Sequence, residues 1–396
     1  MSDLHKLFPK VALIADQMVA YGGADRELFA VLKILPNADI FTITFEQSKY
    51  PGVQSNVHTS FVQKISRYLP KGFYRHLKIF TPWAYESFDL NGYDLVISIS
   101  AGPGKGVITG LNQPHIAMVM TPPRSLWDKE LNARGSKLKR IYEPLSHILN
   151  TYMRVWDISI SKRVDYWTAN SKFIAKKIQK IYRKESTVIY PGVEEKYFKK
   201  PEELFMKKVK GKYKIPDDYV LVFSRLYDYK KVDVAIRACI AAEKNLIVLG
   251  EGPDRKYLEK IAEGHENIRF LGYVKDEEAI VFLRLAKVLL FCGIEDFGLI
   301  PLEAMACGTP VFAYGFGGVL ETVKAGITGE FFQTEEELLS LLINLDKNRY
   351  NTDKIIAHAQ EFTEKKFLLN LEKYLKQVYA QEKGRKNERC KGSNSM

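Results

Sequence analysis

The sequence predicts an α/β protein of two domains, each built on a doubly wound parallel sheet. Short apolar runs alternate with longer amphipathic stretches, which is the pattern of buried parallel strands and their covering helices. The pattern occurs twice, and 396 residues are enough for two domains that each bury a core. The expected strands are Val11–Ala15, Ile40–Phe45, Asp94–Ser100, His115–Val119 and Tyr166–Ala169, then Tyr219–Phe223, Leu246–Leu249, Ile268–Leu271, Val288–Phe291 and Pro310–Ala313.

The boundary between the domains is expected at Pro191-Gly192, after the strand-like Thr187–Tyr190. We therefore predict a first domain over 1–190 and a second over 191–360. A final amphipathic helix is expected over 361–380, and the polar residues 381–396 are expected to form a disordered tail. Ligands bind outside the carboxyl ends of strands in such sheets, so the default site is a cleft between the two domains.

Composition excludes several classes of protein. No apolar run reaches the length of a membrane span, and Val11–Ala15 is too short for the core of a signal peptide. We therefore expect a cytoplasmic protein, with attachment to the inner membrane face left open. The four cysteines have no C-x-x-C spacing, which argues against a zinc site or a disulfide framework.

The net charge of +12 is uneven along the chain. Residues 1–190 contain 26 Lys and Arg against 15 Asp and Glu, whereas residues 191–380 contain 28 against 30. The basic first half suggests an anionic surface or substrate. The alternative is a basic face that only keeps the protein soluble.

The first chemical signal is Ser224-Arg225-Leu226-Tyr227-Asp228-Tyr229-Lys230-Lys231, directly after an expected strand. Arg225 and Lys230 would lie at the carboxyl end of the sheet. A diphosphate needs such a pair, a planar guanidinium fork and a point charge. Taken alone, the two residues could equally be a solvated cluster of charges.

The second signal runs from Glu295 to Glu303 and continues into Cys307-Gly308-Thr309-Pro310. Gly298 allows a ligand to approach the backbone, and Pro301 suits the first turn of a helix. The free N–H groups of that helix would point at a phosphate. Glu295, before the helix, can accept hydrogen bonds from sugar hydroxyls, and Glu303, within it, can bind a ribose diol. The alternative is a pair of surface glutamates.

These two segments resemble the fourth family of retaining glycosyltransferases, which share the two-domain GT-B fold with Rossmann-like domains. The family has two glutamates with seven residues between them, as Glu295 and Glu303 have. Further matching segments occur in order along nearly the whole chain: Gly22-Gly23-Ala24, Ser98–Gly106, Thr121–Arg124 with Leu126–Asp128, Asn170-Ser171 and Tyr190–Val193. Residues 229–233 and 82–88 look like the mannosyltransferase-type branch that builds surface polysaccharides.

The resemblance implies roles for individual residues. Arg225 and Lys230 would bind the donor diphosphate and neutralise it as it leaves, and Glu295 would contact the transferred sugar. The remaining donor contacts would come from the backbone of Phe297, Gly298 and Leu299, from Glu303 at the ribose, from the backbone near Val274 at the base, and from Gly22 and Gly23 in the first domain.

One position departs from the family. The family usually has His directly before the Thr-Pro of the first-domain motif, and this chain has Met120. Any contact of that imidazole to the sugar is therefore in doubt. No D-x-D motif occurs in the chain, and two cations with a helix dipole can do the electrostatic work of a metal. We therefore expect no cofactor and no metal.

Residues 47–85 contain no acidic residue but are rich in basic and aromatic ones. Lys71, Arg75 and Lys78 could meet an anionic membrane or a lipid diphosphate, and Arg124 could lie on the acceptor side. The alternative is a core-packed segment with a solvated basic face. We expect no nucleic-acid binding, because no known module accompanies these residues. Gly102–Gly106 lacks the full Walker spacing, which argues against an ATPase.

The sequence therefore favours transfer of a hexose from a nucleotide sugar to a lipid-linked or saccharide acceptor, with GDP-mannose as the expected donor. Two alternatives stay open: a UDP-sugar-dependent transferase, and a sugar-nucleotide-binding protein without transfer.

Overall fold

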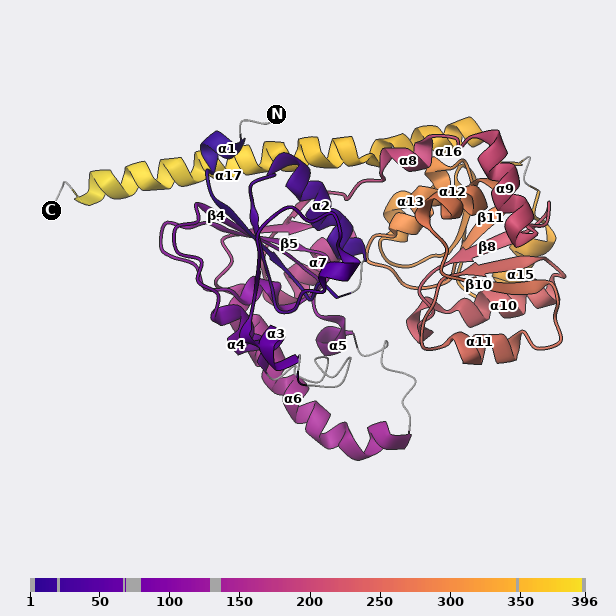
Figure 1. Ribbon diagram of the computed structural model, residues 1–396, viewed down its shortest axis with the longest axis horizontal. Coiled ribbons are helices and arrows are strands. Elements are labelled where there is room, and N and C mark those ends of the chain that lie inside the picture. The colour runs from indigo at the N-terminus through magenta and orange to yellow at the C-terminus, as the bar shows by residue number, and fades with distance from the viewer. Residues whose placement is uncertain are drawn as a thin grey trace. The chain divides into compact units, whose positions relative to one another are not determined.

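The computed structural model describes residues 4–19, 22–66, 68, 80–128, 137–346 and 349–393, and the chain divides into two compact units (Figure 1). Unit 1 comprises Met1–Tyr190 and Phe367–Met396, and unit 2 comprises Pro191–Lys366. The chain thus changes units at the Tyr190–Pro191 bond, the position that the sequence suggests. Each unit contains one parallel sheet, so the α/β class with two Rossmann-like domains is confirmed.

The sheet of unit 1 has the strand order β3-β2-β1-β4-β5-β6-β7, and every pairing is parallel. Side chains along β1 alternate between two buried layers: Val11, Leu13 and Ala15 pack on one face, and Ala12 and Ile14 on the other. A strand buried on both faces reads as a continuous apolar run, which is why the sequence identifies it. The strands are β1 (Val11–Ala15), β2 (Asp39–Thr42), β3 (Val57–Thr59), β4 (Leu95–Ser100), β5 (His115–Val119), β6 (Tyr166–Ala169) and β7 (Thr187–Val188).

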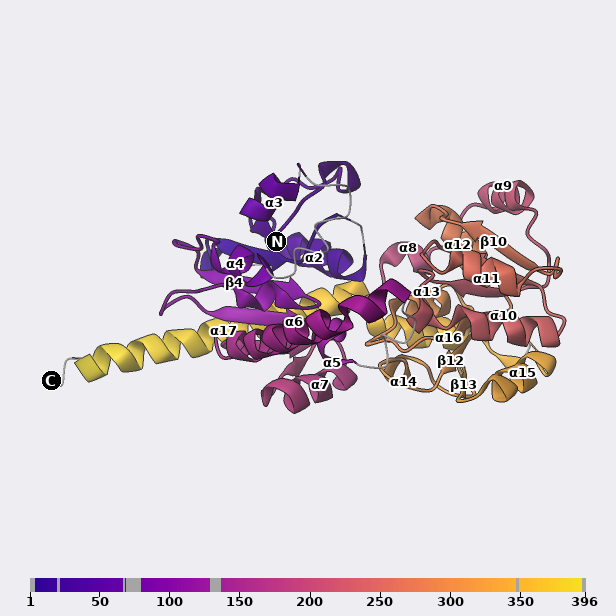
Figure 2. The same cartoon turned by 90° about the horizontal axis from the view of Figure 1, so that it is seen from below.

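Helices cover both faces of this sheet (Figure 2). One face carries α1, α2 and α17, whose apolar side chains share a cluster with β1 and β4. The other face carries α3 and α4 over β1 and β2, and α7 over β5 and β6. The helices are α1 (Leu4–Leu7), α2 (Gly23–Ile34), α3 (Phe61–Ser66), α4 (Thr81–Glu86), α5 (Arg124–Trp127), α6 (Lys137–Ser161), α7 (Lys172–Tyr182) and α17 (Glu364–Ser393).

The sheet of unit 2 has the order β10-β9-β8-β11-β12-β13, again with parallel pairings throughout. Its central strands are fully buried, as in β9 and β11. The strands are β8 (Val220–Phe223), β9 (Leu246–Leu249), β10 (Ile268–Gly272), β11 (Val288–Phe291), β12 (Val311–Tyr314) and β13 (Gly329–Phe332).

The helices of unit 2 fall into two groups by their contacts. α10 packs with α11 and α15, whereas α13 packs with α8, α12 and α16 (Figure 1). The two groups cover opposite faces of the sheet, as a doubly wound fold requires. The helices are α8 (Glu195–Phe198), α9 (Glu203–Tyr213), α10 (Val232–Ala241), α11 (Arg255–Ile261), α12 (Asp276–Leu285), α13 (Leu299–Ala306), α14 (Val319–Thr322), α15 (Glu335–Ile343) and α16 (Thr352–Ala359).

The end of the chain differs from the sequence prediction. We expected a helix over 361–380 followed by a disordered tail over 381–396, but α17 begins at Glu364 and continues to Ser393. Phe367, Leu371 and Leu375 are buried in the core of unit 1 and fix the first turns. Propagation beyond a fixed turn is favourable for Gln, Glu, Lys and Arg, which are good helix formers. These residues therefore continue the helix beyond the turns that the core fixes.

A buried ion pair closes the loop after β4. Lys105 Nζ lies 2.5 Å from Asp157 Oδ1, and the two side chains are 4% and 1% exposed. The other carboxylate oxygen, Asp157 Oδ2, accepts hydrogen bonds from Trp127 Nε1 at 2.8 Å and from the Tyr182 hydroxyl at 2.7 Å. Lys105 thus ties the loop to α5, α6 and α7. It faces the interior, which explains why the glycine-rich segment Gly102–Gly106 is not a phosphate loop.

We predict that Lys105→Met destabilises unit 1 by about 3–5 kcal/mol, because it leaves the Asp157 carboxylate buried without its counter-ion. Urea unfolding followed by near-UV circular dichroism measures this loss. Lys162→Met, at an exposed lysine directly after α6, should change stability little. The double variant Lys105→Met/Asp157→Leu should recover part of the loss. Equal stability of Lys105→Met and the wild type would contradict the prediction.

Candidate active site

Each sheet has a point where the strand order reverses. In unit 1 it lies between β1 and β4, and in unit 2 between β8 and β11. Loops from the two flanking strands diverge there, and the carboxyl ends of the strands leave a crevice that typically binds the ligand. Among the sequence-predicted site residues, Gly22 and Gly23 follow β1, Arg225 and Lys230 follow β8, and Glu295 follows β11.

Arg225 and Lys230 follow β8 in unit 2. Arg225 is exposed, and its guanidinium lies 5.7 Å from the centre of the Tyr227 ring. Lys230 ends a short 3-10 turn over Asp228–Lys230, and its ammonium lies 5.1 Å from the Tyr229 ring centre. The Lys230 side chain is only 12% exposed. The structure therefore offers one exposed cation and one largely covered cation at the same edge of the sheet.

Glu295 follows β11, and its Oε1 forms an ion pair with Lys230 Nζ across the switch point. The Glu295 side chain is 19% exposed. The structure thus brings together a cation and a carboxylate that are 65 positions apart in the sequence. The pairing is a finding of the structure, because the sequence places both residues near a ligand without placing them in contact with each other.

Glycines bring these loops into backbone contact. A Cβ on Gly293 would lie 2.8 Å from Lys230 Cα, closer than real Cβ contacts allow. Beyond β12, Gly318 N donates to Glu295 O at 2.9 Å, and a Cβ on Gly318 would lie 2.1 Å from Asp296 O. Gly317 has φ +89°, in the left-handed region that favours glycine. The position of Glu295 therefore depends on glycines in two loops.

Gly298 ends the loop and begins α13. Its φ of +92° is left-handed, and Leu299 starts the helix directly after it. The first N–H groups of a helix have no partner within the helix, so they can meet an anion. Phe297, before Gly298, is buried with its ring 6.2 Å from Phe362. Glu303 lies within α13 and is 2% exposed, so it sits deeper than a surface carboxylate would.

The predicted base-binding segment follows β10. Gly272 has φ +71°, and Gly250 N donates to Gly272 O at 2.8 Å, which joins this loop to the end of β9. Val274 is buried. Tyr273, which lies between Gly272 and Val274 in the sequence, is 76% exposed. An exposed aromatic ring at the carboxyl edge of a sheet can stack on a base. The sequence analysis named Val274 and did not name Tyr273.

In unit 1, Gly22 and Gly23 lie at the start of α2. Gly22 N donates to Asp25 Oδ2 at 2.7 Å, which caps the helix. A Cβ on Gly23 would meet no described atom within 4 Å, and one on Gly22 would meet only Asp25 at 3.7 Å. Packing against described atoms therefore does not require glycine at either position.

Asp16 was not among the site residues predicted from the sequence. It directly follows β1, and its carboxylate accepts from Ser100 Oγ at 2.6 Å and from Ala101 N at 2.7 Å, at the end of β4. It therefore bridges the switch point of unit 1. Burial raises the pKa of Asp16, an effect that these hydrogen bonds only partly offset. The signal available in the sequence was an acidic residue immediately after a buried strand.

Burial also raises the pKa of Glu27, in the second turn of α2, to about 8. Its Oε2 has no hydrogen-bond partner within the described part of the chain. Glu27 is one turn from the glycine pair, and no sequence motif distinguishes it from a surface glutamate.

Met120, at the position of the family's usual His, has a structural role here. Its N donates to Ser100 O at 3.1 Å, its O accepts from Asn170 Nδ2 at 3.0 Å, and its side chain packs against the core of unit 1. Arg124 is the first residue of α5 and is half-buried. Lys71, Arg75 and Lys78 lie outside the described residues.

Among the described residues, no set of three or more His, Cys, Asp or Glu side chains could hold a metal ion. Within the same ranges, no helix combines the length and apolar character needed to cross a membrane.

Part of the chain is similar to a known protein family. Residues 205–378 match the family model described as "Glycosyl transferases group 1". These residues include Arg225, Lys230, Glu295 and Glu303. The match extends over most of unit 2 and the start of α17, and the two parallel-sheet domains have the GT-B fold.

Similar proteins include the D-inositol 3-phosphate glycosyltransferase of Stackebrandtia nassauensis, 31% identical over 236 residues, and the alpha-monoglucosyldiacylglycerol synthase of Acholeplasma laidlawii, 24% identical over 328 residues. The first alignment covers 50% of this chain and about half, 51%, of the relative. The second covers 75% of this chain and 80% of the relative.

Solved structures share the fold along nearly the whole chain. Anabaena HepE, in complex with UDP and glucose, has a TM-score of 0.69 at 17% identity and covers 93% of this chain and 99% of its own. The sucrose-phosphate synthase of Thermosynechococcus elongatus has a TM-score of 0.72 at 18% identity and covers 94% and 99%. At such identities the likeness shows the fold.

We predict that Gly318→Ala destabilises unit 2 by about 1–3 kcal/mol, since its Cβ would overlap the backbone of Asp296. Thermal or urea unfolding measures the change. Gly211→Ala is the matched control, because this glycine lies inside α9 with open space around it. The control should stabilise by up to about 1 kcal/mol. An unchanged Gly318→Ala variant would show that the loop can move away from Glu295.

Proposed function

We propose that the protein is a retaining glycosyltransferase that moves a hexose from a nucleotide sugar to a lipid-linked or saccharide acceptor. The observation that carries this proposal is the juxtaposition of Lys230 and Glu295 across the β8–β11 switch point, beside Arg225. Two cations suit a diphosphate, and a carboxylate suits sugar hydroxyls. The group 1 match covers the same residues.

The ion pair suggests how the donor engages the site. Without a ligand, Lys230 is neutralised by Glu295. A donor diphosphate competes for the Lys230 ammonium, and this competition releases the Glu295 carboxylate to accept hydrogen bonds from the sugar. Arg225, exposed and paired only loosely with Tyr227, supplies the second charge. As the glycosidic bond to the diphosphate breaks, the two cations stabilise the charge that develops on the leaving group.

We propose GDP-mannose as the donor. The family resemblance supports it, as does the GDP-mannose-dependent alpha-(1-6)-phosphatidylinositol dimannoside mannosyltransferase of Mycobacterium tuberculosis, which is 36% identical over 99 residues, 24% of this chain. A UDP-sugar is the second candidate, because the HepE structure of the same fold was solved with UDP. We propose that the transfer reaction requires no metal ion, since the two cations and the start of α13 supply positive charge.

A thermal-shift screen against GDP-, UDP- and ADP-sugars decides among donors, because a ligand of the native state raises its stability by mass action. Release of nucleoside diphosphate, with and without acceptor and with EDTA, then separates a transferase from a binding protein. Binding without release in the presence of saccharide and lipid-linked acceptors would favour the non-transferring alternative, for which Met120 in place of His is the one hint.

Lys230→Ala and Arg225→Ala should each lower turnover by about a hundredfold or more, because removing one preorganised charge at a leaving group costs about 3–4 kcal/mol. Initial rates of nucleoside diphosphate release measure the effect. Lys256→Ala, at an exposed lysine on α11, is the control and should retain full activity. Circular dichroism confirms that the variants are folded. Near-normal turnover of either variant would refute the diphosphate assignment.

The product is expected to keep the α configuration of the donor, as the family resemblance implies. Glu295 would not act as a covalent nucleophile, because the family resemblance implies a contact to the sugar hydroxyls rather than a position at the reacting face. NMR coupling constants of the purified product give the configuration of the new bond. A β linkage formed from an α-linked donor would overturn this expectation.

We also propose that unit 1 rests on an anionic membrane surface. The described parts of the basic stretch expose apolar side chains on or next to α3 and α4: Ile65 is 41%, Tyr68 90%, Phe80 38% and Trp83 64% exposed. The Phe61 and Trp83 rings, 4.8 Å apart, join the two helices. Aromatic rings among basic residues suit the headgroup region of a bilayer. The acid-free sequence at 47–85 supplies the charge.

Charge reversal of Lys71, Arg75 and Lys78 to Glu should weaken sedimentation with equimolar phosphatidylglycerol–phosphatidylcholine vesicles, because each basic residue near the surface contributes about 1 kcal/mol. Trp83→Ala should weaken it further. Donor hydrolysis should be unchanged. The matched control reverses the exposed lysines Lys207, Lys208 and Lys214 of unit 2. Equal binding of wild type to neutral vesicles, or no binding at low salt, would reject a membrane role.

A further inference from the structure

α6 exposes an apolar ridge on the side that faces away from the unit 1 sheet. Ile148, Tyr152 and Val155 follow one another at intervals of four and three residues, which places them on one side of this helix. They are 69%, 52% and 67% exposed. Met153 and Asp157 lie on the opposite side of the helix and are buried. The described part of unit 1 therefore leaves this apolar ridge uncovered.

α7 exposes a cationic ridge in the same way. Its apolar side packs on β5 and β6 through Ile174, Ile178 and Tyr182. No acidic residue occurs from 172 to 184. The exposed cations recur at intervals of three or four residues along α7 and its C-terminal end: Lys172, Lys176, Lys180 and Arg183. This ridge therefore presents only positive charge.

The two ridges lie side by side, because α4, α6 and α7 pack on the same face of the sheet. Figure 2 shows α6 between α4 and α7. Trp156 of α6 donates from Nε1 to Glu86 Oε1 of α4 at 3.3 Å, and Asp157 of α6 accepts from the Tyr182 hydroxyl of α7 at 2.7 Å. Trp83, three residues before Glu86 on α4, is 64% exposed. The apolar ridge is thus flanked by an exposed aromatic residue and by the cationic ridge.

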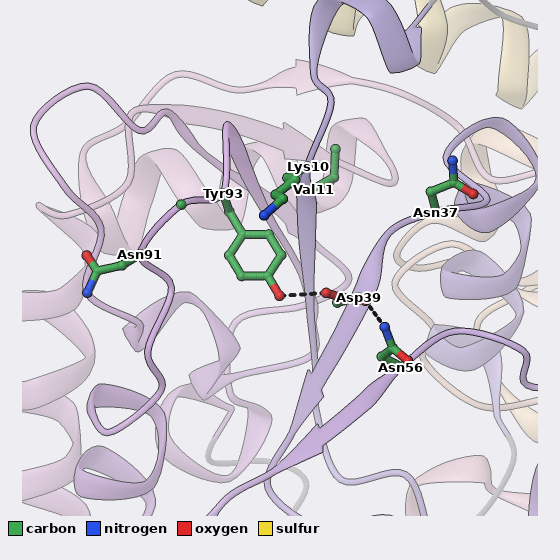
Figure 3. A pocket seen from close by; sticks show the side chains of 8 residues that line it. Lys10, Val11, Asn37, Asp39, Asn56, Asn91 and Tyr93 are labelled. Atoms are coloured by element: carbon green, nitrogen blue, oxygen red, sulfur yellow. Dashed lines mark hydrogen bonds between the residues drawn. The ribbon is translucent and has the colours of Figure 1, made fainter.

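The amino edge of the same sheet has a different character. The Asp39 carboxylate there accepts hydrogen bonds from the Tyr93 hydroxyl at 2.6 Å and from Asn56 Nδ2 at 2.9 Å. These residues belong to a hollow that is lined mainly by polar residues: Lys10, Val11, Asn37, Asp39, Asn56, Asn91, Gly92 and Tyr93 (Figure 3). Contact with lipid would remove water from such groups, which is costly. This part of unit 1 is therefore suited to water.

An apolar ridge beside a cationic ridge suits the surface of an anionic bilayer. The apolar side of an interfacial helix enters the boundary between headgroups and acyl chains, and basic side chains meet the lipid phosphates. A bilayer supplies both chemistries at once, over any area. We propose that unit 1 docks on an anionic phospholipid bilayer through this face, with the α6 ridge in the acyl boundary and the α7 ridge at the phosphates.

This inference rests on the membrane role proposed for unit 1 and deepens it. That role used the aromatic residues on or next to α3 and α4 and the charge of residues 47–85, whereas the two ridges lie outside that stretch. They define how the unit lies, because α6 must run along the bilayer surface for its ridge to enter. Charges attract over about a Debye length, and apolar side chains act only in contact, so the two contributions are separable.

The first experiment is sedimentation of the full chain with equimolar phosphatidylglycerol–phosphatidylcholine vesicles. The α6 variant Ile148→Ser/Tyr152→Ser/Val155→Ser should bind at least about tenfold more weakly than wild type, because it has fewer apolar groups to remove from water. Release of nucleoside diphosphate with a soluble saccharide acceptor should be unchanged, since the three positions are exposed and distant in the sequence from the proposed donor contacts.

The matched control replaces three exposed apolar side chains of unit 2, in the variant Leu204→Ser/Tyr257→Ser/Ile343→Ser. These residues lie on α9, α11 and α15, and the control should bind vesicles as wild type does. Circular dichroism of both triple variants checks that they are folded.

The cationic ridge is tested separately. Lys176→Glu/Lys180→Glu/Arg183→Glu should weaken vesicle binding by more than about tenfold at low salt, because each cation near the surface attracts anionic lipid. The difference from wild type should shrink in about 0.5 M salt, where charges are screened. The α6 variant should keep its deficit at both salt concentrations.

Insertion is measured directly with a fluorescent label. Val155→Cys, in a Cys390→Ser background, carries an environment-sensitive fluorophore, because the other three cysteines are buried. Vesicles with acyl chains brominated near the headgroups should quench this label and shift its emission to the blue. The same label at Leu204→Cys, on α9 of unit 2, should show neither change.

Equal vesicle binding by wild type and the α6 variant would overturn the inference, as would an unquenched label at Val155. Self-association of wild type without lipid that the α6 variant loses would also overturn it, because a second copy would then cover the ridge. If Lys71, Arg75 and Lys78 still matter in these cases, the membrane role itself survives. Failure of wild type to bind any vesicle would reject both, and nucleoside diphosphate release tests the transferase independently.

Discussion

The ion pair between Lys230 and Glu295 depends on how closely three loops approach one another, and glycine permits that approach. Gly293 lets the loop after β11 pass against the backbone of Lys230, and Gly318 lets the loop after β12 hold Glu295 by a hydrogen bond. A side chain at either position would separate the strands' carboxyl ends. The geometry of the candidate site is therefore set by backbone contacts, and the charged side chains complete it.

Basic residues serve two purposes in this protein, and burial distinguishes them. Lys105 is buried with Asp157, and this pair holds three helices to one loop. The charge of Lys105 is therefore neutralised within the fold. Lys230 also has a carboxylate partner, but both members of that pair keep part of their surface accessible. A buried pair resists exchange because separating it exposes an uncompensated charge. An accessible pair can exchange one partner for a phosphate oxygen.

Much of this arrangement could be predicted from the sequence. Strands buried on both faces appear as apolar runs, so β1, β5, β6, β9 and β11 were predicted with the bounds that the structure shows. Short strands at sheet edges, such as β3 and β13, were missed because only a few of their residues are buried. Motif order identified Arg225, Lys230, Glu295 and Glu303, whose placement at or near the carboxyl edge follows from strand direction.

Other features depend on contacts between residues that are far apart in the sequence, and no local sequence pattern predicts such contacts. The sequence gives no sign that Lys105 pairs with Asp157, that Asp16 meets Ser100, or that Asp39 is held by Tyr93. The helical end of the chain was missed for a related reason. Its polar residues suggest disorder when read alone, whereas Phe367, Leu371 and Leu375 anchor the preceding turns to a core that begins at Leu4.

Met120 shows how the structure accommodates a departure from the family. Its backbone N–H and carbonyl make the hydrogen bonds that join β5 to the end of β4 and to Asn170, and these bonds do not depend on the side chain. The side chain itself packs on the core of unit 1, where a thioether fits an irregular space and an imidazole would need polar partners. The loop can therefore keep its path without the imidazole. What changes is the hydrogen-bonding group that the loop could offer to a sugar, so any effect of this residue should fall on donor choice or rate rather than on folding.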